Sequence, residues 1–182
     1  MIGIKVITFQ NKIGSDNILS NEVAYPSIKP NNRGWRSKEL EPRDEYFLKY
    51  NESKGTSFKN FLWGFTSLIG DDCEPIDLFD LDKEQVSNAV GMIGLSIENM
   101  KEYKLFNLEV PNEFVLETDF YDYTDSIFDI DVYPLIPEIF NPNKSTRDVQ
   151  AIFPFIRREW ICNIKCIGEL LKCNNQKTHL FS

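Results

Sequence analysis

The sequence predicts an α+β fold, in which a mainly antiparallel sheet is flanked by about three helices, including a long C-terminal helix. Short runs of β-branched and aromatic residues indicate the strands. Apolar side chains that recur every three or four residues indicate the helices. Hydrophobic residues make up 42% of the chain and aromatic residues 13%, which is enough for a packed core. We expect one domain over residues 1–182, because a chain of this length fits a single core.

The N-terminal part begins with a short run rich in Ile, Val, Thr and Phe, which predicts a strand over residues 2–9. Residues 10–55 form a loop-rich region, since Pro, Asn and Gly interrupt any periodicity there. Within that region, residues 43–50 favour a short helix.

An aromatic stripe predicts a helix over residues 57–69, with Thr56 or Ser57 at its start and Gly70 at its end. A stripe with this spacing is more typical of a buried helix face than of a cofactor site. Its members fall at helical spacing: Phe58, Phe61, Leu62, Phe65, Leu68 and Ile69.

A second helix is predicted over residues 83–100, because Asp82 and Gln85 have the spacing of a capping box. Gly91 and Gly94 weaken this helix, since each costs about 1 kcal/mol relative to Ala in a helix interior. Alternatively, these glycines permit the close crossing of another element.

The middle of the chain favours strands over residues 103–110, 113–121 and 126–133, where β-branched and aromatic residues partly alternate with polar ones. Residues 121–125 would then form the turn between the last two strands.

The C-terminal part has its longest apolar stripe over residues 153–172, which predicts the long C-terminal helix. Pro154 is tolerated in a first helical turn. A strand over residues 160–168 is the alternative, because Ile, Trp and Cys also favour sheets; the long helical match favours the helix. Residues 174–182 are polar, and we expect a frayed tail there.

The charge of the chain is unevenly distributed. Its net charge is −8, from 28 acidic and 20 basic side chains. Residues 105–143 contain no Lys or Arg but nine carboxylates, together with eight Phe and Tyr residues. The remainder is nearly balanced, with 19 acidic and 20 basic side chains.

This acidic, aromatic segment resembles an interface in which rigid aromatic anchors are surrounded by charge. The alternative is an antiparallel sheet with one acidic face in water. As an interface, it would bind a basic protein and would repel nucleic acid and anionic membranes. In general character, size and charge, without any shared motif, the chain is similar to immunity proteins that neutralise a cationic toxin such as a nuclease. The candidate contact residues are Glu117, Asp119, Tyr121, Asp122, Tyr123, Asp125, Asp129 and Asp131.

Most catalytic chemistries find no support in the sequence. His179, in the polar tail, is the single histidine, and neither a phosphate-binding glycine motif nor a zinc-protease motif is present. The acidic residues lack the spacing of a calcium loop. Cys162, Cys166 and Cys173 would span about 16 Å along a helix, too far for one zinc ion. We therefore expect no catalytic site, no metal and no cofactor, and we interpret the cysteines as buried or semi-buried free thiols.

Two alternatives stay open. Abundant carboxylates would also suit a small carboxylate-dependent hydrolase, with or without a divalent ion. A nucleic-acid charge mimic would need carboxylates arrayed at phosphate-like spacing over an extended surface. The short apolar N-terminus, the lack of any long apolar segment and the sparse cysteines favour a cytoplasmic location.

Overall fold

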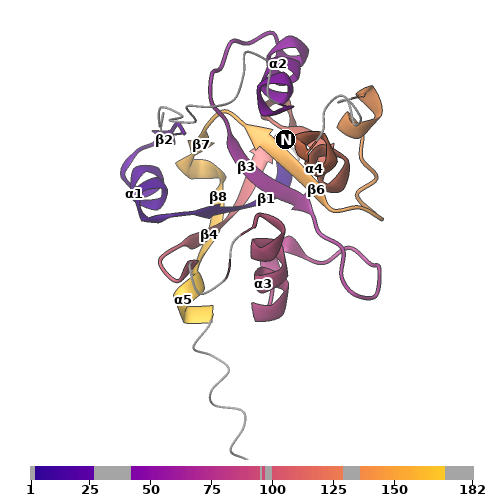
Figure 1. Ribbon diagram of the computed structural model, residues 1–182. Coiled ribbons are helices and arrows are strands. Elements are labelled where there is room, and N and C mark those ends of the chain that lie inside the picture. The colour runs from indigo at the N-terminus through magenta and orange to yellow at the C-terminus, as the bar shows by residue number, and fades with distance from the viewer. Residues whose placement is uncertain (1–2, 27–41, 95, 97–99, 129–135, 171–182) are drawn as a thin grey trace, which may run out of the picture.

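The computed structural model describes residues 3–26, 42–94, 96, 100–128 and 136–170. At its centre is a six-stranded sheet with the order β5-β6-β3-β1-β4-β8, in which every neighbouring pair is antiparallel (Figure 1). A two-stranded sheet lies beside it. The strands are β1 (Gly3–Gln10), β3 (Leu62–Ser67), β4 (Lys104–Pro111), β5 (Leu116–Asp119), β6 (Val149–Phe153) and β8 (Ile161–Cys166), with β2 (Val23–Ala24) and β7 (Ile156–Arg157) in the second sheet.

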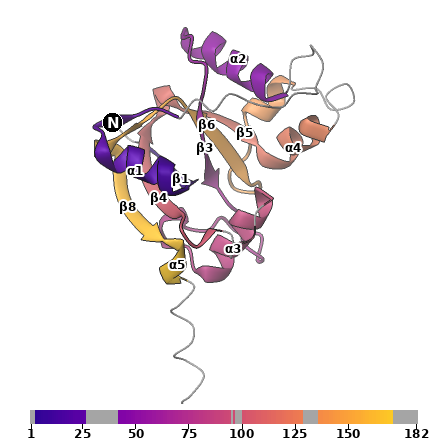
Figure 2. The same cartoon turned by 60° about the vertical axis from the view of Figure 1, so that its left-hand side comes forward.

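Helices lie around the edges and faces of this sheet, so the α+β class is confirmed. Figure 2 shows α2 and α4 together near one end of the sheet, and α3 with α5 near the other. No helix within the described ranges is long and apolar enough to cross a membrane. The helices are α1 (Lys12–Ser20), α2 (Pro42–Lys54), α3 (Lys83–Met92), α4 (Phe120–Phe128) and α5 (Ile167–Leu170), with 3₁₀ turns η1 (Leu78–Asp80), η3 (Asn112–Phe114), η4 (Pro137–Phe140) and η5 (Arg158–Trp160).

The core has two layers because successive side chains of a strand point to opposite faces. On β1, Ile7 packs against α3 and α5, whereas its neighbour Val6 packs against α1, β2 and β7. A third cluster lies on the Ile7 face near β5 and β6, where Tyr46 and Tyr50 of α2 cover Ile152. Aromatic side chains fill much of these layers, as the composition indicates.

Several predicted elements are confirmed. The strands predicted over residues 2–9 and 103–110 correspond to β1 and β4, which pair with each other along eight residues. The short helix near residues 43–50 is α2. The capping box of α3 is present: the backbone N–H of Gln85 donates to Asp82 at 2.9 Å, and that of Asp82 donates to Gln85 at 3.0 Å.

The helix predicted over residues 57–69 is wrong, because this segment contains strand β3. A strand between two others is buried on both faces and reads as a continuous apolar run, which periodicity does not distinguish from a helix. Gly64 is the feature of the sequence that indicates a strand here, since a glycine within a strand often marks a close backbone approach. A Cβ atom at Gly64 would lie 2.6 Å from the carbonyl oxygen of Ile7.

The long C-terminal helix over residues 153–172 is also wrong. Its residues form the end of β6, then β7, η5, β8 and the short helix α5. The deciding contacts are non-local: β8 pairs with β4, and β7 pairs with β2. The alternative of a strand over residues 160–168 agrees better with the structure, because β8 lies within it. Residues 174–182, predicted as a frayed tail, lie outside the described residues.

Because the C-terminal helix prediction is wrong, it also places the nearby cysteines wrongly. Cys162 and Cys166 lie on strand β8, and Cys173 lies outside the described residues. Cys162 and Cys73 are exposed, so for these two the expectation of buried or semi-buried thiols is wrong. Cys166 is partly buried, as expected.

Three further corrections concern element boundaries. The helix predicted over residues 83–100 ends at Met92, where Gly94 takes a φ of 73°. The loop-rich region also contains α1, whose N-cap residue Asn11 accepts the N–H of Gly14 with its side chain. Residues 121–125 are not a turn but belong to α4, which also replaces the start of the strand predicted over residues 126–133.

Candidate acidic surface at strand β5 and helix α4

The candidate contact residues fall into three groups. Glu117 and Asp119 lie on β5, an edge strand of the main sheet. Four others follow directly on α4, and Asp129 and Asp131 lie outside the described residues. The four on α4 are Tyr121, Asp122, Tyr123 and Asp125.

The two carboxylates on β5 have cationic partners within the chain. Glu117 forms an ion pair with Lys144, and its side chain is 18% exposed. Asp119 lies 3.6 Å from Arg147 Nε, and its side chain is 6% exposed. Both cations precede β6 in the sequence, just beyond the segment that lacks Lys and Arg. Because β6 pairs antiparallel with β5, this part of the chain lies beside β5. These two carboxylates are therefore neutralised internally.

Asp119 also explains why α4 begins where it does. Its Oδ1 accepts the backbone N–H groups of Tyr121 at 3.0 Å and Asp122 at 3.1 Å. These are two of the first N–H groups of the helix, which have no partner inside it. Sequence reasoning assigned Asp119 to an interface, whereas the structure shows it capping a helix and pairing with Arg147.

Tyr123 belongs to the core. Tyr123 is 4% exposed, and the centre of its ring lies 5.3 Å from that of Tyr46 and 5.5 Å from that of Trp63. Phe120 is likewise buried against Phe65. Residues 120 and 123 share one face of α4, because positions three apart on a helix are neighbours. The opposite face of α4 is the one available to a partner.

That opposite face presents an aromatic side chain. Tyr121 is 49% exposed, and its pKa is raised by partial burial, then by a hydrogen bond to Asp148 and the charge of that carboxylate. Asp148 is itself buried and accepts the backbone N–H of Ile69 at 2.7 Å. The ring of Tyr121 lies 5.4 Å from that of Phe120, while part of it faces solvent.

Two exposed carboxylates accompany Tyr121 on α4. Neither Asp122 nor Asp125 forms an ion pair with a described residue. The pKa of Asp122 is raised, first by partial desolvation and then by the negative charges of Asp119 and Asp125, while Arg147 opposes this rise. A cation placed beside Asp122 would favour its charged form.

Some residues of this surface were missed by sequence reasoning, namely Lys144, Arg147 and Asp148. They lie one to five residues beyond the segment of residues 105–143 that lacks Lys and Arg. The sequence shows their charges, but only strand pairing shows which carboxylates they meet.

Comparisons with known proteins give no relative: no protein-family model, no curated protein and no solved structure matches this chain. Over the residues that the structure describes, no group of three or more His, Cys, Asp or Glu side chains could hold a metal ion.

Proposed function

We propose that this chain is a protein-binding domain that masks a basic partner, and that its contact surface is the exposed face of α4. The main support is one arrangement: Tyr121 is half exposed beside Asp122 and Asp125, which have no ion pair with a described residue. In its most concrete form, the partner is a cationic toxin such as a nuclease, and this chain is an immunity-type inhibitor.

The division of labour among the acidic residues differs from the simple sequence hypothesis. Glu117 and Asp119 already have Lys144 and Arg147 as counter-ions, so we assign them to holding β5 and the start of α4 in place. The unneutralised carboxylates then attract the partner. A half-exposed tyrosine has only two side-chain torsions to fix on binding, and it supplies apolar area at the centre of an interface.

The net charge of −8 extends this attraction beyond direct contact. Clustered charges of one sign accelerate association with an oppositely charged protein and make its rate depend on salt. We propose the cytoplasm as the setting, in keeping with the free thiols of Cys73, Cys162 and Cys166.

The experiment begins with the immobilised chain and a lysate of its native host. We expect it to retain a basic protein, and we expect the Asp122→Lys/Asp125→Lys variant to lose that protein. The matched control is Asp71→Lys/Glu84→Lys, which changes the net charge equally at two exposed carboxylates on other elements. Equal losses in both variants would show that net charge alone matters and would refute the α4 surface.

The second stage uses the purified partner. We expect the α4 double variant and Tyr121→Ala each to weaken its affinity at least tenfold, about 1.4 kcal/mol, with the control nearly unchanged. For the toxin form of the proposal, co-expression with the wild-type chain should relieve the partner's toxicity. Competition by DNA for the partner would favour a charge mimic instead.

A further inference from the structure

The exposed face of α4 combines one aromatic ring with two carboxylates. Over residues 120–126, the exposed side chains of this helix are Tyr121, Asp122 and Asp125. A helix turns by about 100° per residue, so Tyr121, Asp125 and Asp122 follow one another around its axis at about 0°, 40° and 100°. The other side of α4 is buried through Phe120 and Tyr123. The ring and the carboxylates therefore share one strip of surface, with Asp125 next to Tyr121.

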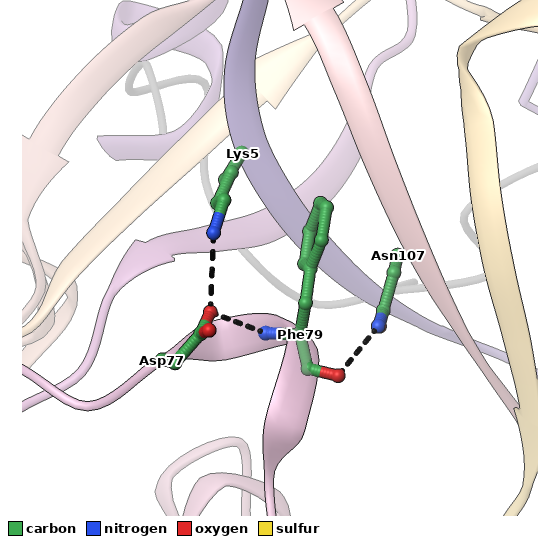
Figure 3. A network of polar contacts seen from close by, with 4 residues as sticks. All are labelled: Lys5, Asp77, Phe79 and Asn107. Carbon is green, nitrogen blue, oxygen red and sulfur yellow. Dashed lines mark hydrogen bonds and ion pairs between the residues drawn. The ribbon is translucent and has the colours of Figure 1, made fainter.

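Elsewhere, this chain holds cations between an aromatic ring and a carboxylate. In one case, Lys5 Nζ lies 4.9 Å from the centre of the Phe79 ring and 3.2 Å from Asp77 Oδ1 (Figure 3). The backbone N–H of Phe79 donates to Asp77 Oδ1 at 3.1 Å, and its carbonyl accepts the side-chain amide of Asn107 at 3.2 Å. The cation is attracted by the carboxylate and by the negative face of the ring together.

Arg157 is a second cation with such surroundings. Its guanidinium carbon lies 5.7 Å from the centre of the Phe155 ring and 5.9 Å from that of the Trp160 ring. One of its guanidinium nitrogens also lies 3.5 Å from a carboxylate oxygen of Glu159. Phe155 and Trp160 are stacked, with ring centres 5.3 Å apart. Here a planar cation contacts an aromatic surface and a carboxylate at the same time.

Helix α2 shows the same combination on a helix surface. The guanidinium carbon of Arg43 lies 5.9 Å from the centre of the Phe47 ring, and one of its nitrogens lies 3.6 Å from Asp44. Positions four apart on a helix are neighbours, as Arg43 and Phe47 are, and Tyr121 and Asp125 have the same separation on α4. Among the described residues, however, no cation lies over the Tyr121 ring or pairs with Asp125. The α4 face thus has the ring and the carboxylate, and a partner can supply the cation.

We propose that the exposed face of α4 binds an arginine side chain of the basic partner in preference to a lysine. The guanidinium would lie over the exposed part of the Tyr121 ring and donate to the Asp125 carboxylate, while Asp122 adds to the negative potential. A guanidinium is planar and more weakly hydrated than an ammonium, and it can donate two parallel N–H bonds to one carboxylate. This inference rests on the proposed function and specifies the chemical group that is recognised.

The test titrates the full-length chain with three end-capped peptides at constant salt, made of Arg-Gly, Lys-Gly or citrulline-Gly repeats, and follows backbone amide shifts by NMR. We expect saturable shifts at Tyr121, Asp122 and Asp125 with the arginine peptide, and a Kd about two- to fivefold higher for the lysine peptide. Citrulline is a neutral isostere of arginine and should not bind. If the lysine or citrulline peptide binds as tightly, or if no peptide shifts these amides, the inference is overturned. Retention of a basic protein from the host lysate would still support the proposed function.

Variants of the ring and of the carboxylate separate selectivity from simple attraction. Tyr121→Leu should bring the ratio of the lysine and arginine Kd values close to one, whereas Tyr121→Phe should keep most of the difference. Both peptides are compared on the same variant, so a change in stability does not alter this ratio. Asp125→Asn should weaken both peptides, whereas Asp71→Asn, at an exposed carboxylate beyond β3, should change neither appreciably. An unchanged ratio in Tyr121→Leu would mean that the ring does not select arginine, and would overturn the inference.

Discussion

The hydroxyl of Tyr46 on α2 donates a 2.7 Å hydrogen bond to the carbonyl oxygen of Leu116 on the edge strand β5. Tyr50, one turn further along α2, donates at 3.0 Å to the carbonyl oxygen of Phe114. An uncovered sheet edge exposes backbone groups that can pair with another chain. The Tyr46 bond therefore occupies one carbonyl of this edge strand, and the Tyr50 bond holds η3 just before it. In this way α2 positions the strand that leads into α4.

Replacing Tyr46 with Phe should lower the free energy of unfolding by about 1–3 kcal/mol, because the partly buried Leu116 carbonyl and the buried Thr118 hydroxyl lose their partner. Urea denaturation measures this change. The control is Tyr25→Phe, since Tyr25 is 57% exposed. Equal stability of the Tyr46 variant and the wild type would show that the edge does not depend on this bond.

The same tyrosines predict a loss of stability in alkali. Burial raises the pKa of Tyr46 and of Tyr50 above the ordinary value of 10.0. Above pH 10 the unfolded chain then loses the tyrosine protons while the folded chain keeps them, so stability falls as pH rises. For Tyr46 the slope is at most about 1.4 kcal/mol per pH unit. Denaturation between pH 9 and 11 should show a shallower decline in Tyr46→Phe; an unchanged slope would contradict this.

Local signals were sufficient for part of the fold. The strand β1 and the start of α3 could be predicted because a short β-branched run and the Asp82–Gln85 box are determined by neighbours in sequence. Strands β3 and β8 could not, because their pairing partners are far along the chain. Their apolar residues also happen to fit a helical period, and tertiary pairing overrides such local preferences.

The candidate surface shows the same limit. The acidic segment was visible as a run of charge, but its division into paired and unpaired carboxylates was not. That division depends on β5 and β6 lying side by side, which places Lys144 and Arg147 beside Glu117 and Asp119. The charge pattern of the sequence therefore predicts where negative charge is concentrated. The pairing of the strands determines which of these carboxylates are neutralised by Lys or Arg.

Asp119 offers a test of its double role. Asp119→Ala removes both the helix cap and the partner of Arg147, so we expect a loss of about 1–2 kcal/mol or more. Asp119→Asn should lose less, because Asn caps helices about as well as Asp but has no charge. Chemical denaturation of both variants measures the difference. If Asn were as damaging as Ala, the ion pair rather than the cap would dominate.

Asp77 supplies a test in acid. Its pKa lies below the ordinary 3.8, first because it accepts the N–H of Phe79 and then because of Lys5. Its contribution to stability is therefore present above pH 3.8 and is lost as pH falls through the lowered pKa. Carboxyl NMR titration should show that Lys5→Met moves this pKa only part of the way back. A complete return to 3.8 would mean that the Phe79 bond has no effect.

Two glycines give opposite expectations for the same substitution. At Gly64 a Cβ atom would lie 2.6 Å from both the Ile7 carbonyl oxygen and Val6 Cγ1. Backbone cannot move aside within a paired sheet, so Gly64→Ala should cost about 1–3 kcal/mol or more. At Gly91, on α3, nothing lies within 4 Å, which also removes the close-crossing interpretation of this glycine. Gly91→Ala should therefore stabilise by about 0.5–1 kcal/mol through helix propensity. Thermal unfolding of both variants measures the contrast, and a tolerated Ala at position 64 would refute the close approach of β1 and β3.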